Sequence, residues 1–224
     1  MNALPVTIAV GPDQEVSGLW LAPEGARAAL VLGHGAGAGM AHRSMTAIAE
    51  GLAERGVASL RYNFLYMERG SKRPDTPALA HAAVRAAVAR AATLAPGLAL
   101  FAGGRSFGGR MTSQAQAAEP LPGVRGLVFF AFPLHPPGKP GIERAEHLAQ
   151  VGIPMLFLQG SRDEFAQLDL LEATVARLGD QASLTLLDHA DHSFHAPARS
   201  GRKDPEVMAQ ALDAARDWMA RIAT

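Results

Sequence analysis

The sequence predicts an α/β fold, in which helices cover both faces of a mostly parallel sheet of about eight strands. Apolar strand-like segments alternate with helix-like segments along most of the chain, as in repeated β-α-β units. The strand-like segments are apolar on both faces, which is typical of parallel sheets covered on both sides. With 224 residues, 48% of them hydrophobic, the chain is expected to form one domain over residues 1–224.

Eight segments have the composition of β-strands. In chain order they are residues 6–10, 18–21, 29–32, 58–62, 98–101, 126–130, 155–158 and 184–187. The first two are joined by a short connection around Gly11, Pro12 and Asp13. A connection of that length can join only antiparallel strands, so we expect an N-terminal hairpin at one edge of the sheet.

Six segments are predicted to be helices: residues 44–54, 77–94, 107–118, 143–150, 165–178 and 205–222. Residues 78–92 are rich in Ala, the strongest helix former. The last helix has Asp204 as a candidate N-cap and Pro205 as its first residue. The loops predicted at residues 64–75 and 132–141 are too short to make a lid domain.

Charge and composition exclude several classes of protein. Lys and Arg total 21, as do Asp and Glu, so the net charge of zero does not favour binding to nucleic acid or to an acidic membrane. The chain has no Cys, which excludes disulfides and thiolate chemistry. No signal peptide is visible, and no apolar segment approaches the roughly 20 residues of a membrane span. We expect a cytoplasmic monomer or homodimer.

A serine lies between a predicted strand and a predicted helix, with glycines two positions away on either side. Gly104, Ser106 and Gly108 form the pattern G-x-S-x-G, which is typical of a sharp, strained turn that exposes the serine hydroxyl above a sheet. The alternative is a glycine-rich connection in which Ser106 only caps the helix. The position of the motif favours a nucleophile.

A glycine-rich loop, GHGAGAG, begins at Gly33 after the third predicted strand. The residues Gly33, Gly35 and Ala38 fit a dinucleotide fingerprint, which would indicate an NADP-binding oxidoreductase. The next predicted strand has no acidic residue for a ribose, and two strands precede the loop, so this interpretation is weak. In the other interpretation, the backbone amides of Ala36 and Phe107 form an oxyanion hole.

An acid and a histidine follow the last two predicted strands. A serine nucleophile needs a base to accept its proton and a carboxylate to orient that base. Asp163 and His192 supply these groups, and the chain order Ser106, Asp163, His192 is the one that α/β-hydrolases use. His192 is preferred to His189, which is close to the end of its strand, and to His195, which lies further along the loop.

Two alternatives remain for these residues. Asp163 could instead cap the helix predicted at residues 165–178. The spacing of His189, His192 and His195 could suit a metal on a helix, but the segment reads as a loop, so we expect no metal site.

Four segments resemble one branch of a known family. They are GRSFGGR at residues 104–110, PLHPPGKP at 133–140, LQGSRD at 158–163 and FLYMERG at 64–70. Together with the motif order, they are similar to the KANL3/Tex30-type branch of predicted hydrolases, small dienelactone-hydrolase-like members of the α/β-hydrolase superfamily. The resemblance spans nearly the whole chain. It implies an α/β-hydrolase fold with Ser106, Asp163 and His192 as a catalytic triad, and it implies no particular substrate.

The sequence therefore predicts a serine hydrolase that cleaves a small carboxylic ester or thioester without a cofactor. The first alternative is a hydrolase-fold binding or assembly subunit with little catalysis, and the second is the NADP-binding oxidoreductase. Candidate substrate-binding residues lie in the loops over the predicted site, and their arginines could instead be solvated or ion-paired. They are His34, Arg43, Tyr66, Arg69, Arg73 and Arg105.

Overall fold

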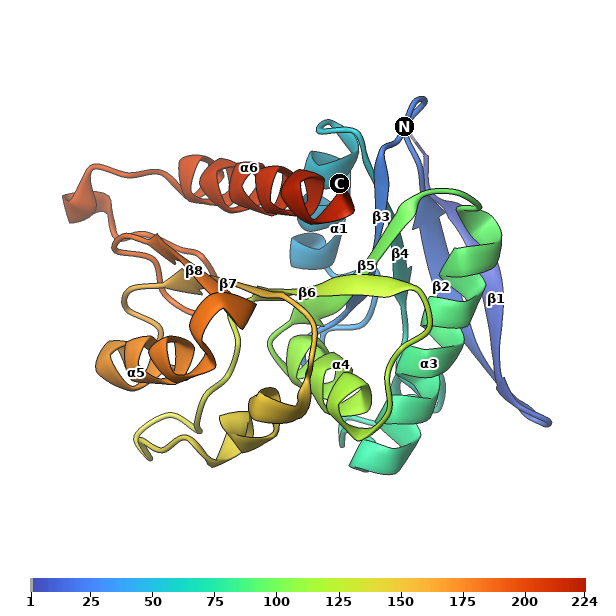
Figure 1. Cartoon of the computed structure of the whole chain (residues 1–224), viewed down its shortest axis with the longest axis horizontal. Coiled ribbons are helices and arrows are strands. Elements are labelled where there is room, and N and C mark those ends of the chain that lie inside the picture. The colour runs from blue at the N-terminus through green and yellow to red at the C-terminus, as the bar shows by residue number, and fades with distance from the viewer. Residues whose placement is uncertain (1) are drawn as a thin grey trace.

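The computed structural model describes residues 2–224, which contain one eight-stranded sheet (Figure 1). The strands occur in the order β1-β2-β4-β3-β5-β6-β7-β8 across the sheet. Their bounds are β1 Leu4–Gly11, β2 Gln14–Leu21, β3 Ala28–Gly33, β4 Val57–Tyr62, β5 Ala99–Arg105, β6 Val124–Phe130, β7 Met155–Gly160 and β8 Ala182–Leu187. All eight predicted strands are confirmed.

Strands β1 and β2 form the predicted antiparallel hairpin at one edge of the sheet. Strand β2 also pairs antiparallel with β4, with Gly18 opposite Tyr62. Every other pairing is parallel, from β4 with β3 across to β7 with β8. The carboxyl ends of β3 to β8 therefore lie along the same edge, where the loops with candidate functional residues begin.

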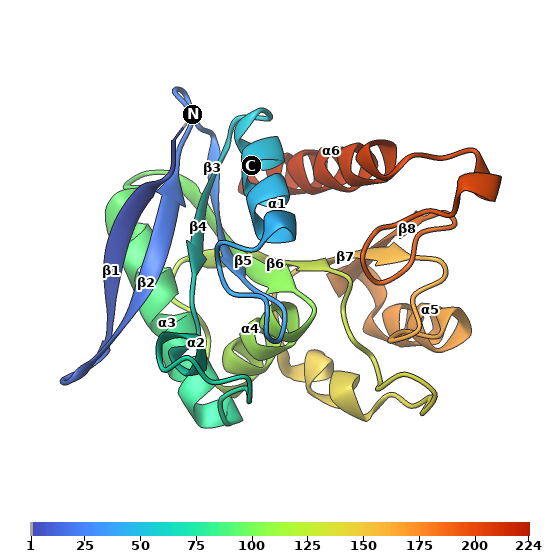
Figure 2. The ribbon, with the colours of Figure 1, turned by 180° about the vertical axis from the view of Figure 1, so that it is seen from behind.

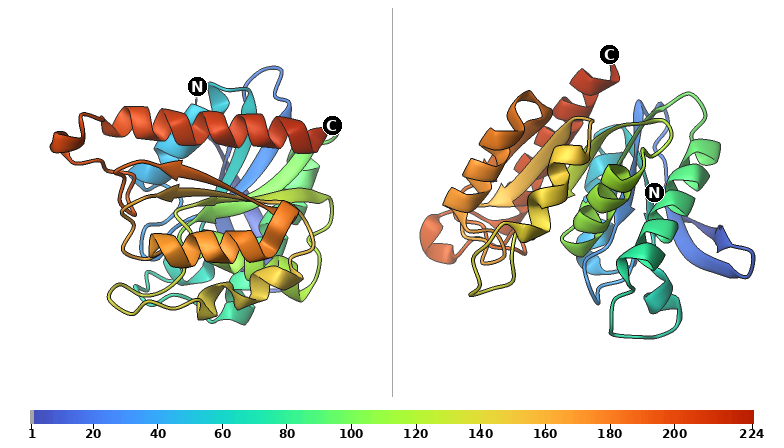
Figure 3. Two further views of the ribbon diagram at one scale, coloured as in Figure 1. Left: turned by 60° about the vertical axis from the view of Figure 1, so that its left-hand side comes forward. Right: turned by 60° about the horizontal axis from the view of Figure 1, so that its bottom comes forward.

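Helices cover both faces of the sheet (Figures 1 and 3). The helices α1 (Arg43–Ala53) and α6 (Asp204–Ala223) lie on one face, and α3 (Pro77–Leu94), α4 (Phe107–Ala118) and α5 (Leu168–Leu178) lie on the other. Short helical segments complete the chain: α2 (Leu65–Glu68) and the 3₁₀ helices η1 (Glu143–Gln150), η2 (Gly179–Gln181) and η3 (Ala198–Ser200).

Strand β3 illustrates why both faces need cover. All six of its residues are buried, and successive side chains point to opposite faces. Val31 joins the core under α3 and α4, whereas Leu30 and Leu32 join the core under α1 and α6. On the latter face, the ring of Trp218 from α6 lies 5.9 Å from that of Phe101 in β5. The predicted two-sided burial is confirmed.

Three of the predictions about the helices need correction. Residues 143–150 form a 3₁₀ helix, with i to i+3 bonds at both ends, rather than an α-helix. Helix α5 begins at Leu168 instead of residue 165, because Asp163 holds the preceding residues in a turn. Asp204 is the first residue of α6 and not its N-cap, since its carboxylate binds His195 and the Ala196 amide.

The connections between the described strands contain no inserted lid domain. The loop after β3 lies in front of α4 when the molecule is seen from behind (Figure 2), which brings it next to the loop after β5. Among residues 2–224, no helix combines the length and apolar character needed to cross a membrane.

Candidate active site

Ser106 occupies a strained turn between β5 and α4. Its φ of 50° and ψ of −114° lie in a region that residues with a side chain rarely adopt. The backbone amide of Ser106 donates a hydrogen bond of 3.0 Å to the Phe130 carbonyl at the end of β6. The neighbouring strand therefore helps to hold the serine in this conformation.

The glycines of the motif are needed because two loops approach each other closely. A Cβ at Gly104 would lie 2.4 Å from the Gly33 carbonyl oxygen, and one at Gly108 would lie 2.3 Å from the same atom. Both distances are far shorter than a van der Waals contact. The G-x-S-x-G spacing thus allows the glycine-rich loop after β3 to pack directly against the serine turn.

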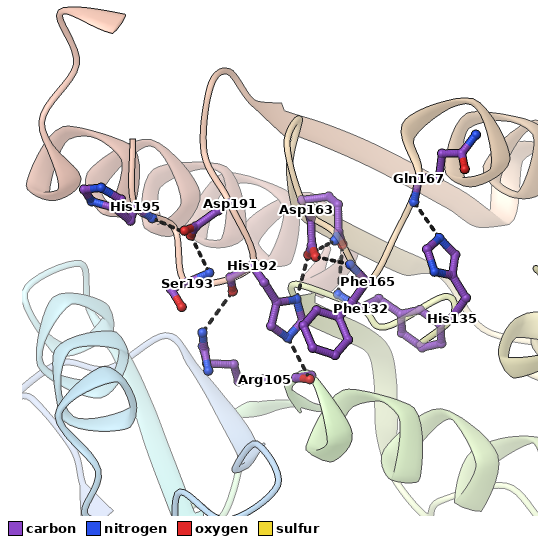
Figure 4. Close-up of polar contacts among 12 residues, drawn as sticks. Arg105, Phe132, His135, Asp163, Phe165, Gln167, Asp191, His192, Ser193 and His195 are labelled. Carbon is purple, nitrogen blue, oxygen red and sulfur yellow. Dashed lines mark hydrogen bonds and ion pairs between the residues drawn. The ribbon is translucent and has the colours of Figure 1, made fainter. Parts of the chain in front are cut away.

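His192 lies between Ser106 and Asp163, and hydrogen bonds link the three side chains. Figure 4 shows the imidazole of His192 beside Asp163. Its Nδ1 is 2.7 Å from Asp163 Oδ2, and its Nε2 is 2.9 Å from Ser106 Oγ. An ionised carboxylate can only accept, so Nδ1 carries the proton and Nε2 of the neutral ring can accept the Ser106 hydroxyl proton. The Asp163 side chain is fully buried, and that of His192 is 16% exposed.

Three donors converge on the Asp163 carboxylate. Besides His192, the Gln159 side-chain amide donates to Oδ2 at 2.5 Å, and the Phe165 backbone amide donates to Oδ1 at 2.8 Å. Gln159 is fully buried at the end of β7, and its own Oε1 accepts from the Phe132 amide at 2.8 Å. Sequence reasoning missed Gln159, although a polar residue ending an apolar strand was the available signal.

Two further contacts fix the position of His192. The Arg105 guanidinium donates to the His192 carbonyl oxygen at 2.9 Å, which ties the loop after β8 to the end of β5. Burial lowers the pKa of Arg105, and the nearby charges of Asp163 and Asp191 oppose that change. The Phe165 ring lies 4.2 Å from the imidazole, centroid to centroid. Arg105, a predicted substrate contact, therefore positions the histidine loop.

The other polar residues of this loop have separate partners. Asp191 Oδ1 accepts from the amides of Ser193 and His195 at 2.7 and 3.0 Å (Figure 4). The His195 ring pairs with Asp204. The His189 backbone amide donates to Ser161. Because the three histidines have different surroundings, they do not converge, and no group of metal-ligating side chains occurs within residues 2–224.

A pocket of about 350 Å³ opens beside Ser106. Ala36 and Phe107 line it, so the two amides predicted to form an oxyanion hole belong to residues at this pocket. The Tyr66 hydroxyl accepts from the Gly37 amide at 2.9 Å, which fixes the glycine-rich loop. The complete lining consists of Ala36, Pro74, Asp75, Pro77, Ser106, Phe107, Arg110, Met111, Pro133, Arg144 and Phe165.

His34, within this loop, and Tyr66, which bonds to it, were also predicted as substrate contacts, and both are fully buried. The Phe64 amide donates to His34 Nε2 at 3.1 Å, and His34 Nδ1 is 2.8 Å from the Gly35 carbonyl oxygen, so both ring nitrogens are engaged. Burial lowers the pKa of His34, which keeps the ring neutral. Both side chains therefore support the glycine-rich loop, and neither lines the pocket.

The remaining predicted contacts are surface arginines. Arg43 lies exposed at the start of α1, and Arg73 is exposed in the loop before α3. Arg69 is half exposed and pairs at 2.5 Å with the buried carboxylate of Asp75, which lines the pocket. None of the three arginines lines the pocket among the described residues, so the structure does not gather them around Ser106.

A serine turn, a buried carboxylate and a bridging histidine at the carboxyl edge of this sheet define a protein of the hydrolase type. The chain belongs to the alpha/beta hydrolase family, since the family model described as "Alpha/beta hydrolase domain" matches residues 26–220. The superfamily that the sequence predicted is confirmed, and so is the fold.

Several solved structures have the same fold. A dienelactone hydrolase from Anabaena variabilis is 20% identical, with a TM-score of 0.78 over 100% of this chain and 99% of that one. XC6422 from Xanthomonas campestris, described as an a/b serine hydrolase without lid, is 21% identical, with a TM-score of 0.74 over 97% and 95% of the two chains. Est1E from Butyrivibrio proteoclasticus with bound ferulic acid is 16% identical, with a TM-score of 0.75 over 96% and 98%.

Proposed function

We propose that this chain is a serine hydrolase that cleaves a carboxylic ester or thioester through an acyl-enzyme intermediate. Ser106 is the nucleophile, His192 the general base and then the general acid, and Asp163 the carboxylate that orients the imidazole. The amides of Ala36 and Phe107 stabilise the oxyanion. We further propose that the chain belongs to the KANL3/Tex30-type branch, on the four sequence segments described above.

In the acylation step, the Ser106 hydroxyl oxygen attacks the substrate carbonyl carbon while His192 Nε2 takes the hydroxyl proton. Asp163 stabilises the resulting imidazolium through the bond to Nδ1. Negative charge develops on the former carbonyl oxygen, where the two backbone amides donate. His192 then gives its proton to the departing alcohol or thiol, which leaves the acyl group on Ser106.

In the second step, a water molecule replaces the leaving group. His192 takes a proton from the water as its oxygen attacks the acyl carbon, and then returns the proton to Ser106 Oγ as the carboxylic acid departs. Every proton transfer passes through one imidazole, so the reaction requires no cofactor.

The observation that carries this proposal is the pair of hydrogen bonds at His192, 2.7 Å to Asp163 and 2.9 Å to Ser106. These lengths match the reach expected between a nucleophile, its base and the group that orients the base. The pocket volume of about 350 Å³ is at the small end for ligand sites and suits a small acyl group. The substrate is therefore a small molecule.

The direct test is labelling with a fluorophosphonate probe, followed by peptide mass spectrometry. We expect the label on Ser106, complete loss of labelling in Ser106→Ala, and full labelling in the control Ser200→Ala, which lies in η3 outside the pocket. A folded wild-type protein that takes up no label would contradict the enzyme and favour the binding or assembly subunit. Saturable NADPH binding would instead favour the oxidoreductase.

A further inference from the structure

Two arginines line the same pocket as Ser106. Arg110 lies one turn into α4, where its amide donates to the Ser106 carbonyl, and Arg144 lies in η1. Within residues 2–224, neither guanidinium has a carboxylate within 4.0 Å, and neither donates a hydrogen bond. Arginines at other positions, such as Arg55 and Arg69, do have such partners.

Arg110 and Arg144 are both half-buried, so solvent screens their charges only in part. Arg110 Nε is buried and has no hydrogen-bond partner. Burial lowers the pKa of Arg110 and of Arg144, and for Arg110 the charge of Arg144 adds to the effect. A buried cation without a partner costs free energy, and two of the same sign near each other cost more. The pocket therefore holds two positive charges that no carboxylate within residues 2–224 pairs with.

The other ionisable groups near the pocket do not remove this potential. Asp75 lines the pocket, but its carboxylate accepts from Arg69 and from the Tyr66 amide. Glu143 and Glu146 neighbour Arg144 along η1, and both are exposed to solvent.

The imidazole of His147 lies near Arg110 and stays neutral. Its pKa falls to about 4, first because it is buried and then because Arg110 and His81 are close. Burial also lowers the pKa of His81. Ser113 Oγ donates to the Arg110 carbonyl and is 2.7 Å from His147 Nε2, so the imidazole donates from Nε2.

We propose that Arg110 and Arg144 bind a carboxylate on the acyl part of the substrate, so that this hydrolase prefers monoesters or thioesters of short dicarboxylic acids. The planar guanidinium fork matches a carboxylate in shape and charge. The assignment of this carboxylate to the acyl part of the substrate rests on the proposed function. A leaving group must reach His192, which does not line this pocket among the described residues, so the pocket receives the acyl side.

Kinetics on two matched esters test this preference. Monoethyl glutarate and ethyl pentanoate have acyl chains of equal carbon number, and only the first carries a terminal carboxylate. Because hydrogen bonds to a charged group are stronger than those between neutral groups, we expect Arg110→Gln and Arg144→Gln each to lower the glutarate-to-pentanoate ratio of kcat/KM about tenfold or more. An unchanged ratio in both variants would overturn the proposal while hydrolysis itself stands.

Two controls locate the effect. Arg199→Gln removes an exposed arginine of η3 outside the pocket, and it should leave the ratio at the wild-type value. The butyrate ester of glycolic acid carries its carboxylate on the alcohol side. If the two pocket variants impair this ester and spare monoethyl glutarate, the carboxylate that the arginines bind lies on the leaving group, and its placement on the acyl part is wrong.

A binding measurement separates the arginine site from catalysis. In Ser106→Ala, glutarate is titrated while the imidazole signals of His147 are followed by NMR. A bound dianion should raise the pKa of His147, and Arg110→Gln in the same background should abolish the saturable change. If no ester is cleaved but glutarate binds, the carboxylate site stands without the proposed reaction. If glutarate causes no saturable change, the site is refuted whatever the enzyme cleaves.

Discussion

The two sides of Ser106 differ in how their polar groups are satisfied. On the side of His192, Asp163 accepts three hydrogen bonds, and Arg105 holds the His192 carbonyl. On the other side, Arg110 and Arg144 have no acceptor among the residues that the structure describes. The groups around His192 make their hydrogen bonds within the protein, whereas the two arginines lack a negatively charged partner.

This contrast separates two tasks of a site. Groups that must keep one geometry through a reaction are best fully hydrogen-bonded, because each bond limits motion and compensates for burial. Groups that recognise a ligand must keep donors free for it. Substitutions on the His192 side should therefore impair catalysis on every substrate, and substitutions on the arginine side should change substrate preference and local titration.

The largest effect is expected at the residue between the two sides. Ser106→Ala removes the nucleophile and should lower kcat on short p-nitrophenyl esters by roughly 10⁶-fold, as in other triad enzymes. The circular dichroism spectrum should match that of the wild type, and Ser200→Ala should retain full activity. A Ser106→Ala enzyme with more than a tenth of the wild-type rate would mean that another residue is the nucleophile.

The next largest effect concerns the acid. Asp163→Asn keeps the size of the side chain but replaces an acceptor with a donor opposite Nδ1, which favours the wrong tautomer and costs about 10⁴ in kcat in a serine protease. Asp188→Asn is the matched control, because Asp188 is exposed after β8. Steady-state kinetics should show a loss of at least two orders of magnitude in the first variant. A severe loss in Asp188→Asn with a mild one in Asp163→Asn would reverse the assignment.

A smaller effect is expected at Gln159, which acts only through its neighbours. Gln159→Leu removes the donor to Asp163 and leaves the buried Phe132 amide without an acceptor, so the free energy of unfolding should fall by about 1–3 kcal/mol. We expect kcat to fall more than KM rises, since Asp163 loses orientation. Urea denaturation and kinetics measure the two effects, with the exposed Gln181→Leu as the control. If Gln159→Leu keeps the wild-type kcat, Gln159 contributes to stability and does not position Asp163 for catalysis.

The smallest effect is a pH dependence on the arginine side. His147 has a pKa of about 4 in the folded protein against 6.5 as a reference, so the unfolded chain binds more protons between these values. The free energy of unfolding is therefore at its full value above pH 6.5, where His147 is neutral in both states. It falls as the pH drops toward 4. Allowing for solvent screening of a partly exposed group, the loss should be about 1–2 kcal/mol.

Arg110→Gln tests the source of that dependence. Removal of the guanidinium should raise the pKa of His147, so the variant should lose less stability than the wild type between pH 7 and pH 5. Urea denaturation at the two pH values and an NMR titration of His147 measure both quantities. Identical pH profiles would show that burial alone controls His147.

The sequence was sufficient for the strands and for the order of the chemical groups. Residue patterns with a period of two, or with continuous apolar character, predicted all eight strands, because those patterns depend only on neighbours in the chain. The G-x-S-x-G spacing predicted a tight turn at Ser106. The structure adds the reason for both glycines, since a Cβ at either one would collide with the loop after β3. The sequence also placed Asp163 and His192 after successive strands, and the structure brings both within hydrogen-bond distance of one another.

Only the tertiary structure decided which polar residues have partners. His34 and Tyr66 resemble pocket residues in the sequence, but packing buries both side chains away from the pocket. Arg69 and Arg110 are alike in chemical type, yet one meets the Asp75 carboxylate and the other meets the charge of Arg144. Local sterics and periodicity act between near neighbours and can be read from a sequence, whereas these partnerships depend on how distant segments pack around the sheet.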